Sequence, residues 1–122
     1  MSTLKSYQDL EVWKKSIDLA EMIYRISTQF PTEEKFGLTS QIRRAAVSVP
    51  ANIAEGAARN GTGEFLQFLG VASGSLAETE TFLILAERLH MLTPEQTHPV
   101  QQQAADVGRM LNGLKRSLRS KS

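Results

Sequence analysis

The stretch from residue 41 to residue 59, QIRRAAVSVPANIAEGAAR, decides the fold of this chain, because it carries two side-chain stripes at the period of an α-helix. One stripe is small and apolar and consists of Leu38, Ile42, Ala46, Val49, Ile53 and Ala57. The other is polar and consists of Gln41, Arg44, Ser48, Asn52, Glu55 and Arg59. Because such polar side chains donate and accept hydrogen bonds in fixed directions, we expect this row to be a seam against another surface.

Pro50 lies in the middle of this expected helix and lacks the amide that would bond to the carbonyl oxygen of Ala46. We therefore predict one helix that is kinked at Pro50. The alternative is a break, with Ser48 capping a second, shorter helix that begins near Val49 or Pro50.

Helical periodicity and turn residues divide the chain into four helices, at about residues 9–28, 38–58, 63–90 and 94–119. Asp9 and Thr62 are the expected N-caps of the first and third helices, and residues 93–96, TPEQ, form a capping box. No segment has the alternation of a strand. The sequence thus predicts an all-α, antiparallel up-down-up-down four-helix bundle that spans residues 1–122 as a single domain.

The expected third helix also carries a row of small residues, namely Gly70, Ser73, Gly74, Ala77 and Thr81. Each interior glycine costs about 1 kcal/mol of helix stability relative to alanine, so we expect the row to let another helix approach closely. That helix is either the second helix of the same chain or the same surface of another subunit. The first helix has a wide apolar face with Trp13 and Tyr24, and together these surfaces exceed what one bundle core needs.

Composition excludes several classes of function. The 122 residues carry a formal charge of +1, no cysteine and two histidines, so disulfides, thiolate metal sites and cysteine nucleophiles are excluded. His90 lies three residues after Glu87, but a second motif of this kind, as di-metal bundles require, is absent. We predict no catalytic, metal or cofactor site and no enzyme. With no signal-like N-terminus and no apolar run near ~20 residues, we expect a cytoplasmic chain without a membrane partner.

The polar seam has three interpretations. In the one we favour it is a structural network, in which Arg44 and Arg59 pair with Glu55, Glu78 or Glu80 while Gln41 and Asn52 bond to backbone or to a subunit partner. In the second, the arginines of the seam and Arg43 face nucleic acid, but Glu55 in the same row would repel phosphates. In the third, Glu55, Glu78, Glu80 and Ser48 form an active site, which lacks a nearby histidine or cysteine.

The basic C-terminal segment is a better candidate for nucleic-acid contacts, which would come from Lys115, Arg116, Arg119 and Lys121. The alternative is a solvated helix end whose cations complement the helix dipole. No aromatic residue is interleaved with these cations, so base stacking has no support there.

Four ungapped motifs carry a resemblance to a known family: residues 9–14, DLEVWK; 36–39, FGLT; 41–56, QIRRAAVSVPANIAEG; and 72–78, ASGSLAE. With them the chain resembles the 23S rRNA-intervening-sequence proteins, from which it departs at Ala57-Ala58 and Pro99. The resemblance implies a four-helix bundle that assembles into a ring, typically a homopentamer, without known catalytic activity. The accessory proteins of diversity-generating retroelements are a related group that works with a reverse transcriptase and nucleic acid.

Two hypotheses follow for the function. The first is a non-enzymatic homo-oligomer that binds RNA or another nucleic acid through a basic surface. The second is an interaction scaffold that docks a partner protein such as a reverse transcriptase.

Overall fold

The computed structural model describes residues 6–121, and this part of the chain is helical without any strand. Four long helices account for most of it: α1 (Glu11–Ser27), α2 (Leu38–Ala57), α3 (Thr62–Arg88) and α4 (Pro94–Lys121). Two short 3-10 turns precede α1 and α2, namely η1 (Tyr7–Asp9) and η2 (Thr32–Glu34). The all-α four-helix fold expected from the sequence is confirmed, with each helix end within two residues of its expected position.

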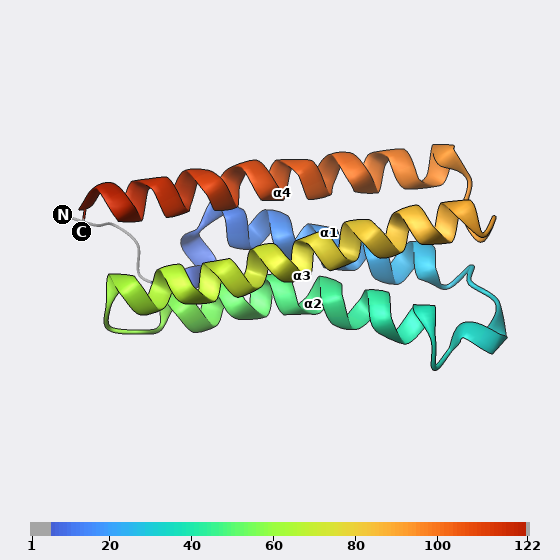
Figure 1. Cartoon of the computed structure of the whole chain (residues 1–122), viewed down its shortest axis with the longest axis horizontal. Helices are drawn as coiled ribbons and strands as arrows, with labels where there is room; N and C mark the ends of the chain where they lie inside the picture. Colours follow the sequence, from blue (N-terminus) through green and yellow to red (C-terminus); the bar gives the residue numbers. More distant parts are fainter. Residues whose placement is uncertain (1–5, 122) are drawn as a thin grey trace.

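The four helices pack around one core, and each contacts two neighbours, in the cyclic order α1, α2, α3 and α4. Consecutive helices run in opposite directions along the long axis of the molecule (Figure 1). The pair formed by α2 and α3 has the most extensive contact. Because α1 and α3 are diagonal to one another, the outward surfaces of these two helices belong to different sides of the bundle.

The core is built from apolar side chains of all four helices. Those that are completely buried include Leu19, Ile23, Ile42, Val49, Ile53, Leu69, Leu83, Val107 and Leu111. The apolar stripe expected on the second helix is buried from Leu38 to Ile53 and only half-buried at Ala57. Burial of this stripe orients α2 and places the polar row beside it, with Ser48 and Asn52 half-buried.

Pro50 is buried within α2, which continues from Leu38 to Ala57. The alternative of a separate second helix that begins near Val49 or Pro50 is therefore wrong. Contacts with α1 and α3 hold the segment on both sides of the proline in place, and this packing outweighs the loss of one backbone hydrogen bond. The kink itself stays a prediction.

The helix caps agree with the sequence at α4 and differ at α1 and α3. In the capping box, the Thr93 amide donates to Gln96 Oε1 at 2.8 Å and the Gln96 amide donates to Thr93 Oγ1 at 3.2 Å. The expected caps at Asp9 and Thr62 are wrong, because Asp9 lies within η1 and Thr62 is already the first residue of α3. The start of α2 is capped instead by Glu34, whose Oε1 accepts the Leu38 amide at 3.0 Å.

Close approach of two helices occurs at Gly56 and not at the row of small residues on α3. A Cβ atom at Gly56 would lie 2.8 Å from Phe68 Cβ and 3.2 Å from the Phe65 carbonyl oxygen. A Cβ atom at Gly70 or Gly74 would meet no such neighbour within 4 Å. The expectation that α2 of the same chain packs against this row is therefore wrong, since the row faces away from the core.

Candidate functional site

The centre of the polar seam is a hydrogen-bonded cluster between α2 and α3. The buried Ser75 hydroxyl donates to Ser48 Oγ at 2.8 Å. Asn52 Nδ2 donates to the same Ser48 Oγ at 2.9 Å and to the Ser48 carbonyl oxygen at 2.8 Å. Three neutral polar groups thus satisfy one another, an arrangement that fixes how α2 sits against α3. The sequence indicated Ser48 and Asn52 but not their partner Ser75.

The charged members of the seam lie on the outside. Arg59 pairs with Glu55 at 2.9 Å, one helical turn away, and its guanidinium lies 4.9 Å from the centroid of the Phe68 ring. Both charged side chains are about half exposed, so the pair contributes little stability, on the order of 0.5 kcal/mol.

The remaining members of the seam do not form the expected network. Gln41, Arg44 and Glu78 are exposed, and Glu80 is half-buried. Within residues 6–121, no ion pair connects Arg44 or Arg59 to Glu78 or Glu80. Within the single chain these groups therefore do not form the expected pairs between helices, and their pairing across a subunit contact stays a prediction.

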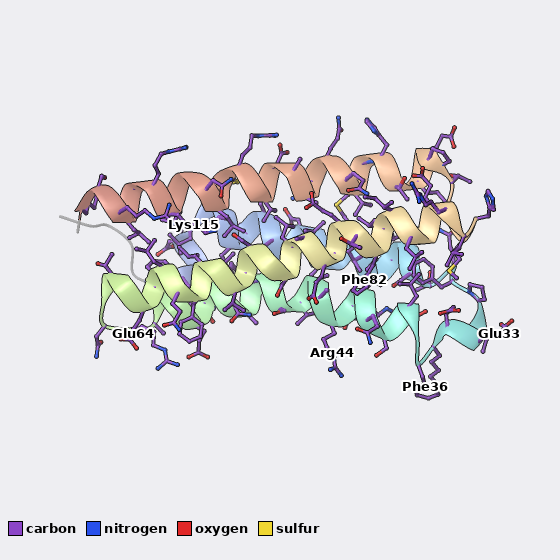
Figure 2. The ribbon with its side chains drawn as sticks, in the orientation of Figure 1. Glu33, Phe36, Arg44, Glu64, Phe82 and Lys115 are labelled. Carbon is purple, nitrogen blue, oxygen red and sulfur yellow. The ribbon has the colours of Figure 1, made fainter. Side chains whose placement is uncertain are left out.

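The basic C-terminal segment is not uniformly exposed. Lys115 is half-buried and its ammonium donates to Ser73 Oγ on α3, a member of the row of small residues that does not belong to its fully exposed part. Burial, and then the nearby charge of Arg119, lowers the pKa of Lys115 below its usual value. Arg116, Arg119 and Lys121 are exposed. Figure 2 shows Lys115 on the inner side of α4, so this lysine is a helix contact and a poor candidate for phosphate binding.

The outward side of α3 carries small and apolar side chains that are unpartnered in the single chain, with the exposed Glu78 among them. Its exposed large side chains are Val71, Ile84 and Leu85, with exposed fractions of 49%, 52% and 41%. Together with the exposed small residues they form a surface that we call the α3 strip: Gly70, Val71, Gly74, Ala77, Thr81, Ile84 and Leu85.

The composition of α3 reflects its two apolar sides. By length and apolarity alone this helix passes as a membrane span, the one such helix in the described part of the chain. Seven of its residues nevertheless lie in the bundle core, on the side opposite the α3 strip, so the helix belongs to the core of the bundle. The sequence-based expectation that the apolar surface exceeds the needs of one core is confirmed.

A second apolar surface lies between α1 and α2. It is a groove, which we call the α1–α2 groove, lined by Ile17, Ala20, Glu21, Tyr24, Arg25 and Val47. Tyr24 and Val47 are exposed by 45% and 43%. The sequence singled out Tyr24 but missed Val47, although Val47 departs from the buried stripe of α2 and could have been found by its position. Trp13, the other residue expected here, is half-buried and packs edge-on against Tyr7.

The described residues contain no group of three or more histidine, aspartate or glutamate side chains that could hold a metal ion. His90 lies at the end of α3 with a positive φ of 60°, the conformation that closes a helix C-terminus. Its amide donates to the Glu87 carbonyl oxygen at 3.0 Å, which places His90 in a capping role at the end of α3.

Comparison with known proteins supports the resemblance found in the sequence. A family model described as 23S rRNA-intervening sequence protein matches residues 8–113. Among solved structures, the chain is similar to a Bacteroides thetaiotaomicron protein with unknown function from the S23 ribosomal protein family. The TM-score is 0.79 at 26% sequence identity, and the match covers 85% of this chain and 97% of that chain. No curated protein matches.

Proposed function

The chain belongs to the 23S rRNA-intervening sequence protein family, and we propose that it acts as a non-enzymatic module that assembles with copies of itself. The observation that carries this proposal is the α3 strip. Soluble monomers rarely expose a contiguous apolar surface, and such surfaces mark interaction sites. Here the strip extends along α3 from Gly70 to Leu85, on the side opposite the buried core residues of the same helix.

The glycines of the strip give the same indication. Gly70 and Gly74 reduce the helix propensity of α3, and within the single chain nothing packs against them. Their cost is offset when a helix of another molecule packs on the strip, because the absence of side chains lets two backbones come close. Self-association gives this costly composition a physical reason.

The α3 strip and the α1–α2 groove are two different apolar surfaces, and α1, which provides most of the groove, is diagonal to α3. A strip that packs into the groove of the next copy is a head-to-tail contact, and such contacts close into rings when the rotation between copies permits. This geometry supports a cyclic homo-oligomer. The number of subunits, five, comes from the family resemblance alone.

Two further expectations have weaker support. A partner protein, such as a reverse transcriptase, is the alternative occupant of the α3 strip. If the C-terminal segment binds nucleic acid, the exposed side chains that would contact it are Arg116, Arg119 and Lys121, because Lys115 is bonded to Ser73.

A matched pair of glycine substitutions tests the role of the strip. Gly74 and Gly113 both have open space where a side chain would begin, so Gly74→Glu on α3 and Gly113→Glu on α4 leave the bundle intact. In sedimentation velocity, Gly74→Glu is expected to sediment as a monomer and Gly113→Glu like the wild type. Equal masses for both variants and the wild type would overturn the proposal.

A mixing experiment tests the head-to-tail geometry. Val47→Glu blocks the α1–α2 groove and leaves the strip intact, whereas Gly74→Glu does the reverse. Each variant alone is expected to be monomeric, and an equimolar mixture should form a heterodimer through the one intact strip and the one intact groove. If Val47→Glu assembles like the wild type, the strips pair with each other and the head-to-tail model is wrong.

A further inference from the structure

A cleft of about 400 Å³ lies where the connection through η2 enters α2, beside the last turns of α1. Three of its lining residues are cationic, Lys35, Arg43 and Arg44, and two are aromatic, Tyr24 and Phe36. No acidic residue lines it. Sequence reasoning considered Arg43 and Arg44 for nucleic acid but not their combination with Lys35 and two aromatic rings, because the five residues come from three separate segments.

Arg43 is held in a fixed position within the cleft. Its Nε donates to Ser27 Oγ at 2.8 Å and its Nη2 donates to the Tyr24 carbonyl oxygen at 3.3 Å. Its guanidinium also lies 4.8 Å from the centroid of the Tyr24 ring. A cation that is ordered before binding loses little side-chain entropy when a ligand arrives. These contacts engage Nε and Nη2, and neither of them involves Nη1.

Phe36 is exposed by 89%, the highest value among the exposed large apolar side chains of the described chain. The Lys35 ammonium lies 5.5 Å from the centroid of its ring. Figure 2 shows that Phe36 and Arg44 both project outward from the same side of the bundle. An aromatic face is thus open to solvent within a group of cations, a combination that the C-terminal basic segment lacks.

The start of α2 does not itself provide the anion site. The Leu38 amide is already bonded to Glu34 Oε1, and this carboxylate reduces the positive potential of the helix end. Attraction for an anion at this cleft therefore comes from the side chains of Lys35, Arg43 and Arg44. This distinction matters because side-chain cations can be removed one at a time by mutation.

We propose that this cleft binds single-stranded nucleic acid, with a base stacked on Phe36 and the flanking phosphates on Arg43, Arg44 and Lys35. Exposed aromatic rings combined with cations are the features by which proteins bind single strands, because every base has a face that can stack. A duplex keeps these faces covered. Thr39 and Ser40 add two hydroxyl groups that can bond to sugar or base atoms.

The proposal does not rest on self-association, although the cleft shares Tyr24 with the α1–α2 groove. The other cleft residues lie outside the groove. A ring would repeat the cleft once per subunit and so raise the avidity for a long strand, but each cleft is complete within one chain.

Fluorescence anisotropy with a labelled 12-nucleotide single strand and the full chain tests the proposal. Phe36→Ala is expected to weaken binding about 10-fold, whereas Phe36→Tyr should bind like the wild type, because stacking needs the ring. Arg44→Gln is expected to weaken binding and to lower its salt dependence. Arg109→Gln, which removes the same charge from an exposed residue of α4, serves as the control and should change little.

The salt dependence gives a second readout. Three phosphate contacts on a single strand predict about a 20-fold loss of affinity between 50 and 200 mM salt, and Arg44→Gln should reduce the logarithmic slope by about one third. Titrations with RNA and with DNA of the same sequence show which of the two nucleic acids the cleft prefers. Stronger binding of either supports the proposal.

Several results would overturn the proposal: absence of binding at 50 mM salt, equal affinity for a duplex, or displacement of the strand by a polyglutamate peptide of equal charge. The same holds if Phe36→Ala binds like the wild type while Arg116→Gln combined with Arg119→Gln abolishes binding. The mass of each variant is measured in parallel. If Phe36→Ala fails to assemble, Phe36 is an interface residue and its assignment to nucleic acid is wrong.

Discussion

The two sides of α3 contain the same kinds of small residue but meet different surroundings. On the inner side, α2 comes so close at Gly56 that a Cβ atom there would lie 2.8 Å from Phe68 Cβ, and Ser75 bonds to Ser48 across the same contact. On the outer side, Gly70 and Gly74 face open space. The glycine at the inner contact, Gly56 of α2, meets a close neighbour within the chain, whereas the close contact that we propose at Gly70 and Gly74 would come from another copy.

The inner side should give the largest effect on folding. Gly56→Ala places a methyl group against Phe68 Cβ and the Phe65 carbonyl oxygen, and relief requires α2 and α3 to move apart. We expect the free energy of unfolding to fall by about 3 kcal/mol, as for an overpacked core site. Urea unfolding measures this value. An unchanged midpoint would mean that the two helices are not locked together at this position.

The next largest loss of folding stability is expected when the hydrogen-bonded cluster of Ser48, Asn52 and Ser75 is broken. Ser48→Ala removes the acceptor of both the buried Ser75 hydroxyl and Asn52 Nδ2, so we expect a loss of about 1 to 2 kcal/mol in urea unfolding. Ser117→Ala, at an exposed position of α4, is the control and should change little. Equal stabilities of the two variants would show that the cluster contributes nothing to the contact between α2 and α3.

The outer side predicts opposite effects on folding and on assembly. Gly74→Ala should stabilise the isolated chain by up to about 1 kcal/mol, because alanine favours the helix and has room here. Urea unfolding in the Val47→Glu background measures this gain without self-association. In the otherwise wild-type chain, the same methyl group should weaken assembly in sedimentation experiments. Stronger assembly would contradict close backbone approach at Gly74.

The smallest expected effect is a pH dependence of the folding stability that comes from Lys115, which contacts Ser73 of α3. Its pKa is lowered in the folded chain by burial and then by Arg119, so the unfolded chain keeps this proton to a higher pH. The stability of the wild type relative to Lys115→Met should therefore rise as the pH increases from the lowered pKa toward the ordinary value of 10.5. Urea unfolding of both proteins at pH 8 and pH 10 measures the difference. A relative stability that falls with pH would contradict the burial of this ammonium.

Local signals in the sequence were sufficient for the helices. The capping box at residues 93–96 and the turn after residue 58 depend on neighbouring residues only, and the apolar stripe of α2 follows directly from its period. The cap of α2 was missed because it comes from the side chain of Glu34, four residues before Leu38, and periodicity does not show which side chain reaches a helix end.

The candidate surfaces were harder to predict, because periodicity identifies a row of residues but not what the row faces. The small row of α3 was recognised, yet the close contact between α2 and α3 occurs at Gly56 of α2 and not at Gly74. Lys115 was expected in solvent, although its long side chain reaches Ser73 on the neighbouring helix. The cleft at Phe36 depends on contacts such as that of Arg43 with Tyr24, which are 19 residues apart and on different helices.

The central claim is that another copy of the chain covers the outer side of α3, and the molecular mass of the unmodified protein tests it most directly. Sedimentation equilibrium at micromolar concentrations should give a defined multiple of the 13.5 kDa chain mass. A mass of 13.5 kDa that is constant across the concentration range would contradict the claim.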